Sequence, residues 1–107
     1  MKPNHRLTAK KLLPAIARFT GLTGQKILDL DKKWNLDHGT PVFTQKGRYT
    51  TRGWTEWTQG FQYGCAILQY DMTDDKHFLT LGRDRTVELM APHVSHIGVH
   101  DHGFNNL

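Results

Sequence analysis

The sequence predicts an all-α fold built from antiparallel helical hairpins. Along four stretches of the chain, apolar residues recur at spacings of three and four, which is the period of an amphipathic helix. The alternation of apolar and polar residues that is typical of a half-buried strand is confined to the short segment 97–99. The chain has 107 residues, of which 37% are hydrophobic, so it can form a small core and represents one domain or less.

The first two helices are predicted at residues 8–20 and 24–34. In the first, Leu12, Ile16 and Phe19 share one face. Pro14 disfavours helical geometry at the residue before it, so we expect this helix to begin or kink there. Thr23 is a good N-cap and can begin the second helix. The apolar stripe of the second helix consists of Ile27, Leu30 and Trp34.

Residues 35–53 are rich in Gly, Pro, Thr and Asn and are predicted to form a long loop. The third helix is expected at 54–72. Gly60 and Gly64 weaken a helix, so we expect another backbone or a ligand to come close to them. This helix has two apolar stripes, which predicts burial on two sides; they are Trp54, Trp57, Phe61, Cys65, Leu68 and Met72, and Tyr63, Ile67 and Tyr70.

The fourth helix is predicted at 77–90, after a break at Thr73-Asp74-Asp75 and before Pro92. No helical stripe follows in the histidine-rich segment 93–107. Four helices do not easily cover a two-sided third helix in a free-standing bundle. We therefore expect residues 1–107 to be a single partial domain, whose remainder buries the second face.

Composition argues against several classes of protein. The longest apolar run, 12–17, is far shorter than the ~20 residues of a membrane-spanning helix. The basic start continues into Lys10 and Lys11 rather than an apolar signal segment, so we expect a cytoplasmic protein without a membrane partner. The net charge of +4 is scattered, which argues against nucleic-acid binding and is compatible with an acidic small ligand. Cys65 is alone, so no internal disulfide forms.

A first candidate site lies at residues 54–61. Two indoles, a hydroxyl, an amide and a glycine stand at the expected start of a helix, directly after a long loop. Aromatic faces stack on sugar rings and amides bind hydroxyls, so Trp54, Trp57 and Gln59 suit a carbohydrate. The alternative is that the aromatic residues only begin a core stripe.

A second candidate site is the segment 96–106. Asp101 lies between His100 and His102, which suggests acid/base chemistry at the carboxylate with imidazole support. The same segment offers a metal-binding alternative, because His96, His100 and His102 together with a carboxylate are ligand types that suit zinc. A third interpretation is a polar loop with solvated histidines.

Three short motifs resemble the N-terminal part of the unsaturated glucuronyl hydrolases, glycoside hydrolase family 88, and of the related family 105. That family has a Trp-Thr-x-Gly-Phe turn, a Thr-Gly-Asp corner and a His-Asp-x-Gly-Phe loop in this order. The matching residues here are Trp57 to Phe61, Thr73 to Asp75 and His100 to Phe104. Departures from the family's pattern fall at Gln59, Gln62, Asp74 and His102.

The resemblance implies a barrel of six α-helical hairpins, of which this chain supplies the first part. It also implies hydrolysis of acidic oligosaccharides that carry a terminal 4,5-unsaturated uronic acid, by hydration of the vinyl-ether double bond and without a cofactor. Asp101 matches an aspartate that supports catalysis, while His100 and Trp57 match residues that line the sugar pocket. The principal aspartate of the family lies on a later hairpin, so we expect the chain to be inactive alone. The alternative from another class is a small helical metal-binding or sugar-binding module.

Overall fold

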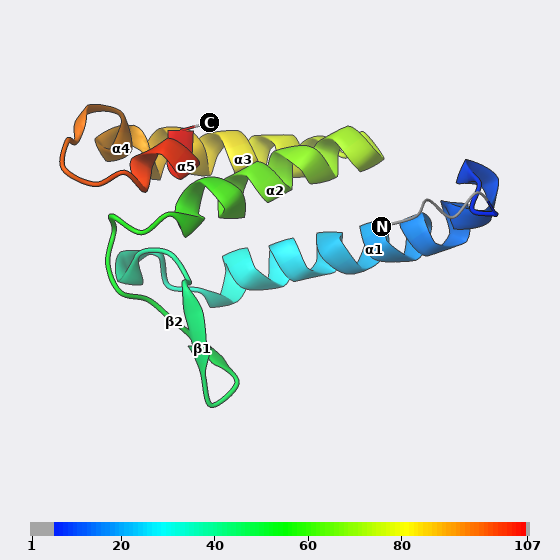
Figure 1. Ribbon diagram of the computed structural model, residues 1–107, viewed down its shortest axis with the longest axis horizontal. Helices are drawn as coiled ribbons and strands as arrows, with labels where there is room; N and C mark the ends of the chain where they lie inside the picture. The colour runs from blue at the N-terminus through cyan, green and yellow to red at the C-terminus, as the bar shows by residue number, and fades with distance from the viewer. Residues whose placement is uncertain (1–5, 107) are drawn as a thin grey trace.

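Helices and one short hairpin make up the computed structural model, which describes residues 6–106 (Figure 1). The mostly helical class predicted from the sequence is confirmed, and a small antiparallel sheet adds to it. Within the described range, the helices do not close into a barrel. The elements in chain order are α1 (Ala9–Lys33), a 3₁₀ turn (Leu36–His38), β1 (Phe43–Gln45), β2 (Arg48–Thr50), α2 (Thr58–Thr73), α3 (Lys76–Leu89), α4 (Ala91–Ser95) and α5 (His102–Asn106).

Helix α1 is continuous over 25 residues, so the prediction of two separate helices at 8–20 and 24–34 is wrong, and the helix begins at Ala9, before Pro14. Thr8 caps the helix by accepting a hydrogen bond from Lys11 N at 3.3 Å. Pro14 removes one backbone hydrogen bond in the second turn, where the exposed backbone is accessible to water. Thr23 begins no helix; it lies inside α1 and its hydroxyl donates to Gln69 Oε1 at 2.7 Å. The tertiary contact with α2 therefore replaces the predicted cap.

The predicted loop at 35–53 contains a β-hairpin that the sequence analysis missed. Phe43 pairs with Thr50, and Gln45 pairs with Arg48. The two turn residues, Lys46 and Gly47, both have positive φ angles, 50° and 74°, as a tight hairpin turn requires. The hairpin projects away from the helices (Figure 1). By contrast, residues 97–99, where short alternation was noted, form no strand.

Helices α2 and α3 form an antiparallel hairpin that contains most of the buried apolar residues. Asp75 caps α3 by accepting from His77 N at 3.0 Å, as the sequence predicted. Gly82 lets the two helices approach closely, because a Cβ there would lie 2.7 Å from Ile67 Cγ1 and 3.0 Å from Tyr63 O. The buried apolar side chains are Tyr63, Ala66, Phe78 and Met90.

Helix α2 has two apolar faces, as predicted, but only one of them is covered within residues 6–106. One face packs through Tyr63, Ala66 and Gln69. The prediction that the other face is also buried is wrong for the described part of the chain. The exposed side chains of this face are Phe61, Cys65, Leu68 and Met72, together with Trp57 at the N-cap; Trp54 lies before the helix and is 46% exposed.

Two short helices, α4 and α5, occupy the segment that the sequence analysis left without helices. Pro92 lies in the first turn of α4, where its missing N–H has no helical partner to lose. Helix α5 is too short to be stable alone, and it is held by side-chain hydrogen bonds to α2 and α4. None of the helices in residues 6–106 is long and apolar enough to cross a lipid bilayer.

Candidate functional site

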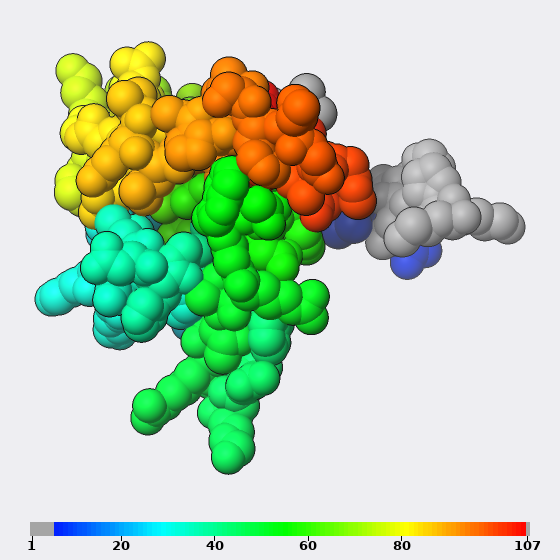
Figure 2. Space-filling view, turned by 90° about the vertical axis from the view of Figure 1, so that its left-hand side faces the viewer, coloured from blue at the N-terminus to red at the C-terminus, as the bar shows by residue number. Residues whose placement is uncertain are grey.

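The two candidate segments of the sequence meet in the folded chain. Asn105 of α5 accepts a hydrogen bond from Gly60 N at 3.0 Å and donates to Glu56 O at 3.0 Å. The start of α2 and the His-Asp-His segment are therefore joined, although they lie about 45 residues apart in sequence. Figure 2 shows this face, with the C-terminal segment in orange and red lying against the green stretch that leads into α2.

Gly60 is the residue that permits this approach. A Cβ at Gly60 would lie 2.6 Å from Asn105 O and 2.7 Å from Asn105 Cα, which no real side chain tolerates. The expectation that another backbone comes close is therefore confirmed at this glycine. At Gly64 no other backbone among the described residues comes close, because nothing lies within 4 Å of a Cβ there.

Three imidazoles and an amide form a hydrogen-bonded row, which we call the histidine chain: His96, His102, His93 and Gln59. His96 Nδ1 lies 2.7 Å from His102 Nε2, and His102 Nδ1 lies 2.8 Å from His93 Nδ1. His93 Nε2 lies 2.5 Å from Gln59 Oε1. His93 and His102 are buried, with 2% and 6% of their surface exposed, whereas His96 is exposed. The row therefore runs from solvent into the protein.

Trp54 covers the histidine chain from one side. Its ring centroid lies 5.5 Å from that of His93, 4.9 Å from His96 and 5.7 Å from His102, and it is stacked on His102 with an interplanar angle of 26°. The sequence analysis placed this indole in a sugar-binding surface. In the structure one side of it is occupied by histidines.

Burial sets the electrostatics at the inner end of the chain. Burial lowers the pKa of His93 below its ordinary value, because a charged ring is poorly solvated there. The neighbouring His102 and His96 lower this pKa further by charge repulsion. Burial raises the pKa of Tyr63, which is hydrogen-bonded to the Gln59 side chain. Both effects favour neutral side chains in this part of the protein.

Three aromatic rings beside the histidine chain form an exposed surface, which we call the aromatic ledge: Trp57, Phe61 and Phe104. The Trp57 centroid lies 5.6 Å from that of Phe61 and 6.1 Å from that of Phe104, both in edge-to-face geometry. All three side chains are about half exposed. A partly exposed set of rings can present faces or edges to the apolar side of a sugar.

Asp101 lies one helical turn before this ledge. Its carbonyl oxygen accepts from Phe104 N at 3.0 Å, and the Asp101 side chain is 31% exposed. His100 Nε2 lies 3.3 Å from Asp101 Oδ1, and the His100 side chain is 91% exposed. Of the predicted site residues, Asp101 and His100 are therefore paired with each other, and Trp57 contacts Phe104, which lies three residues after Asp101.

The structure does not support the metal-binding alternative. His96 and His102 are in contact, but His100 lies outside the histidine chain and faces solvent. Within residues 6–106, no group of three His, Cys, Asp or Glu side chains is placed to hold a metal ion. Each of the close imidazole nitrogens faces a hydrogen-bond partner rather than a common point.

Sequence reasoning missed part of the site and misplaced another part. Gln59 was expected to bind sugar hydroxyls, but only 7% of it is exposed and its oxygen faces His93. His93 and Asn105 were not singled out. The spacing of His93 and His96, three residues apart after a helix-starting proline, is the signal that could have placed both rings on one helix face.

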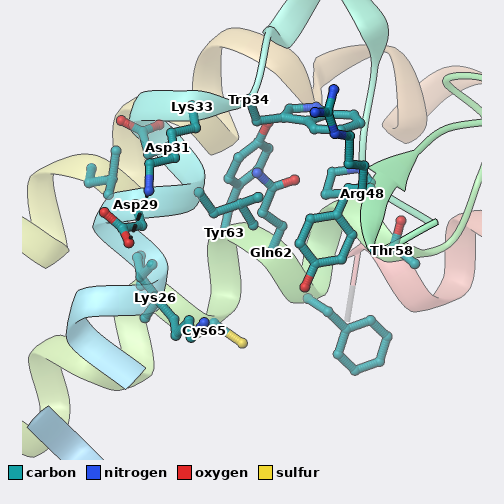
Figure 3. A pocket seen from close by; sticks show the side chains of 18 residues that line it. Lys26, Asp29, Asp31, Lys33, Trp34, Arg48, Thr58, Gln62, Tyr63 and Cys65 are labelled. Atoms are coloured by element: carbon teal, nitrogen blue, oxygen red, sulfur yellow. Dashed lines mark ion pairs between the residues drawn. The ribbon is translucent and has the colours of Figure 1, made fainter. Parts of the chain in front are cut away.

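A separate groove lies between α1, the β-hairpin and α2, with a volume of about 920 Å³ (Figure 3). Trp34, Tyr49 and Phe61 contribute aromatic walls to it. Two buried polar atoms of its lining, Thr58 Oγ1 and Gln62 Oε1, have no hydrogen-bond partner among the described residues. Phe61 belongs to both the groove and the aromatic ledge, so the two surfaces adjoin.

Both signs of charge line the groove. Lys33 pairs with Asp29 at 3.3 Å, and Asp31 pairs with Arg85 of α3 at 3.0 Å. Within residues 6–106, Lys26 and Arg48 form no ion pair. The groove therefore combines rings, uncommitted polar atoms and two cations without carboxylate partners.

A comparison of the chain with family models, curated proteins and solved structures found no match.

Proposed function

We propose that this chain is part of a glycoside hydrolase that releases a terminal 4,5-unsaturated uronic acid from oligosaccharides produced by a polysaccharide lyase. The reaction is hydration of the vinyl-ether double bond: a proton adds to C4, water adds to C5, and the hemiketal opens to release the remaining sugar. The proposal includes the six-hairpin barrel and the cytoplasmic location expected from the sequence.

The observation that carries the proposal is the contact between the two motifs that resemble this enzyme family. Asn105, directly after the His-Asp-x-Gly-Phe loop, accepts from Gly60 N in the Trp-Thr-x-Gly-Phe turn and donates to Glu56 O directly before that turn. The rings of Trp57 and Phe104 meet at 6.1 Å. A shared sugar site requires these two motifs to lie close together, and this contact meets that requirement.

The geometry suits distinct roles for three residues. Trp57, in the aromatic ledge, is half exposed and offers a stacking surface for the sugar ring. Asp101, three residues before Phe104 of this ledge, is partly buried, and in this proposal it supports protonation of the alkene carbon. His100 pairs with Asp101 and is open to solvent, so it can also contact the uronate carboxylate.

The exposed apolar surface favours a chain that belongs to a larger assembly of hairpins. Leu68 and Met72 of α2 are 60% and 47% exposed, and α1 exposes Leu13, Ile16 and Phe19. Contiguous apolar patches of this kind are rare on free monomers and mark surfaces that another part of a protein covers. The additional hairpins of the proposed barrel would cover these faces and supply the second aspartate.

The test uses the full-length protein that contains this chain and an oligosaccharide with a terminal unsaturated uronic acid. Turnover is followed by the loss of ultraviolet absorbance of the double bond. We expect Asp101→Asn to lower kcat by ~100-fold or more, the scale of an acid/base group, while the protein stays folded. Trp57→Ala should mainly raise KM, because stacking stabilises the bound substrate and the transition state alike.

Asp84→Asn on the exposed surface of α3 is the matched control, since it removes the same charge far from the site, and it should leave turnover unchanged. Normal turnover of folded Asp101→Asn protein would remove Asp101 from the mechanism. Failure of the full-length protein to act on any unsaturated uronate would refute the proposal itself.

A sugar-binding module is the second candidate, and the groove between α1 and α2 favours it. The groove offers aromatic walls, the unpartnered Thr58 Oγ1 and Gln62 Oε1, and the cations Lys26 and Arg48. In this case the chain alone binds acidic oligosaccharides without converting them, and Arg48→Ala weakens binding whereas Asp101→Asn does not. Calorimetry with a saturated and an unsaturated uronate oligosaccharide distinguishes the two candidates.

A further inference from the structure

The orientation of the Gln59 amide sets the direction of hydrogen bonding along the histidine chain. Gln59 Oε1 is an acceptor, so His93 donates through Nε2–H and its Nδ1 is the acceptor of a neutral ring. His102 therefore donates to His93 through Nδ1–H, and its own Nε2 accepts from His96 Nδ1–H. Asn105 Nδ2, 3.4 Å away, also faces His93 Nδ1 as a donor. Every ring is neutral in this arrangement, and every inner nitrogen has a partner.

The histidine chain accepts one proton without losing a hydrogen bond. That proton adds to Nε2 of His96, at the exposed end, because His96 Nδ1–H still donates to His102 afterwards. The Trp54 ring lies beside this end of the row, with its centroid 4.9 Å from that of His96 in edge-to-face geometry. A second proton has to enter at His102 Nε2 or His93 Nδ1, and either site would then place two donors face to face.

The bond between His96 and His102 also closes a loop. These two residues are the ends of the segment 96–102, which carries Asp101, and their rings meet at 2.7 Å. His96 follows α4 directly and His102 begins α5, so the same bond joins the two short helices. Breaking it removes the bond that closes the segment with the candidate carboxylate, while Asn105 and Asn106 still join α5 to α2 and α4.

The protonation of the histidine chain is decided mainly by its own imidazoles, because the side chains around it add little charge. From α2, the facing side chain is the uncharged Gln59, and Glu56 contributes its backbone carbonyl to Asn105. In the loop, the Asp101 carboxylate pairs with His100. The charges that act on His93 are those of His102 and His96, which repel a proton from its ring.

We propose that the histidine chain is a pH-responsive clamp on the Asp101 segment. It is closed when the three imidazoles hold no extra proton or one, and it opens when a second proton enters. The consequence for catalysis rests on the proposed function, but the clamp itself follows from the imidazole geometry and involves no sugar. An enzyme with this clamp loses its aligned Asp101 in acid and regains it at neutral pH.

The first test is the ¹⁵N spectrum of the imidazoles in the chain at pH 7.5. We expect His93 to carry its proton on Nε2, and His96 and His102 to carry theirs on Nδ1. The same tautomer in all three rings would overturn the proposal, since the row cannot form without opposite tautomers at His93 and His102. Stoichiometric zinc on these nitrogens would overturn it as well.

The second test follows the urea midpoint of unfolding and the position of the Asp101 segment between pH 7.5 and 5. In the wild-type chain we expect the midpoint to fall with pH, and the contacts between His96 and His102 to disappear in the ¹⁵N and NOE spectra. His93→Gln keeps a donor toward Gln59 and removes the titrating ring, so its midpoint should depend much less on pH. His77→Asn, an exposed histidine on α3, is the matched control and should behave as the wild type.

A wild-type midpoint that does not change with pH, or equal pH dependence in His93→Gln and wild type, would refute the clamp. Neither measurement involves a substrate. The clamp can therefore fail while the hydrolase proposal survives, and the hydrolase proposal can fail while the clamp survives.

Discussion

Gly60→Ala tests whether the contact between α2 and α5 is as close as the structure indicates. The added Cβ would lie 2.6, 2.7 and 2.9 Å from Asn105 O, Cα and C, all of them backbone atoms that cannot rotate away. Ordinary contact begins at 3.4 Å, so α5 has to move by about 0.8 Å. Such a shift lengthens both 3.0 Å hydrogen bonds of the Asn105 side chain beyond a useful range.

The magnitude follows from three contributions. Two hydrogen bonds are weakened, at about 0.5–1.5 kcal/mol each. Overpacking a close contact costs a further ~1–3 kcal/mol, while the helical preference of alanine over glycine returns about 1 kcal/mol. We therefore expect Gly60→Ala to lower the free energy of unfolding by about 1–5 kcal/mol.

Gly64→Ala is the matched control, because it lies one turn later in the same helix and its Cβ meets nothing within 4 Å among the described residues. It should raise the free energy of unfolding by about 0.5–1 kcal/mol through helix propensity alone. Urea unfolding followed by circular dichroism measures both variants, and hydrogen exchange of the α5 amides shows whether the loss is local. Equal stability of the two variants would refute the close approach of Asn105 to α2.

Three further predictions concern α1, the buried histidine and the exposed face. Gln69→Leu should lower the free energy of unfolding by about 1–3 kcal/mol, because the buried Gln69 side chain, 2% exposed, donates a hydrogen bond to α1 at 2.9 Å. Gln25→Leu, at an exposed position, is the control and should change stability little. Equal effects of the two variants in urea unfolding would contradict this contact. Because burial lowers the pKa of His93, the unfolded chain binds more protons than the folded chain below about pH 6.5. The contribution of His93 to stability is therefore present above that pH and is lost as the pH falls, with a limiting slope of ~1.4 kcal/mol per pH unit. Urea unfolding at a series of pH values measures this slope, and stability that rises on acidification would contradict its sign. The protein should bind an apolar fluorescent dye at the exposed face of α2 that contains Leu68. Leu68→Lys should reduce the dye fluorescence more than the control Val87→Lys on α3. Absence of dye binding would show that this face is covered.

Local sequence signals predicted the helical hairpin at the centre of the fold. The periodicity of 54–72 and 77–90 anticipated α2 and α3 to within a few residues, and Asp75 was correctly placed as the cap of α3. These features depend on side chains three or four positions apart and on backbone groups within one turn, so they are encoded in short windows of sequence. The hairpin turn at Lys46-Gly47 was equally local, but its dipeptide is not one of the strong turn signals, and it was missed.

Tertiary contacts between residues far apart in the sequence decided the remaining features, because short segments of sequence do not contain both partners. The sequence predicts that Thr23 caps a new helix. In the structure Thr23 lies inside the continuous helix α1, and its hydroxyl bonds to Gln69, 46 residues away. Gln59 changed from an expected sugar ligand to the buried end of the histidine chain because His93, 34 residues later, lies beside it. The sequence by itself determined two separate segments, one with two indoles before a helix and one with an acidic residue among histidines. Which imidazole is buried and which faces water depended on how α4 and α5 pack against α2, because burial is a property of the packed elements rather than of the residue type.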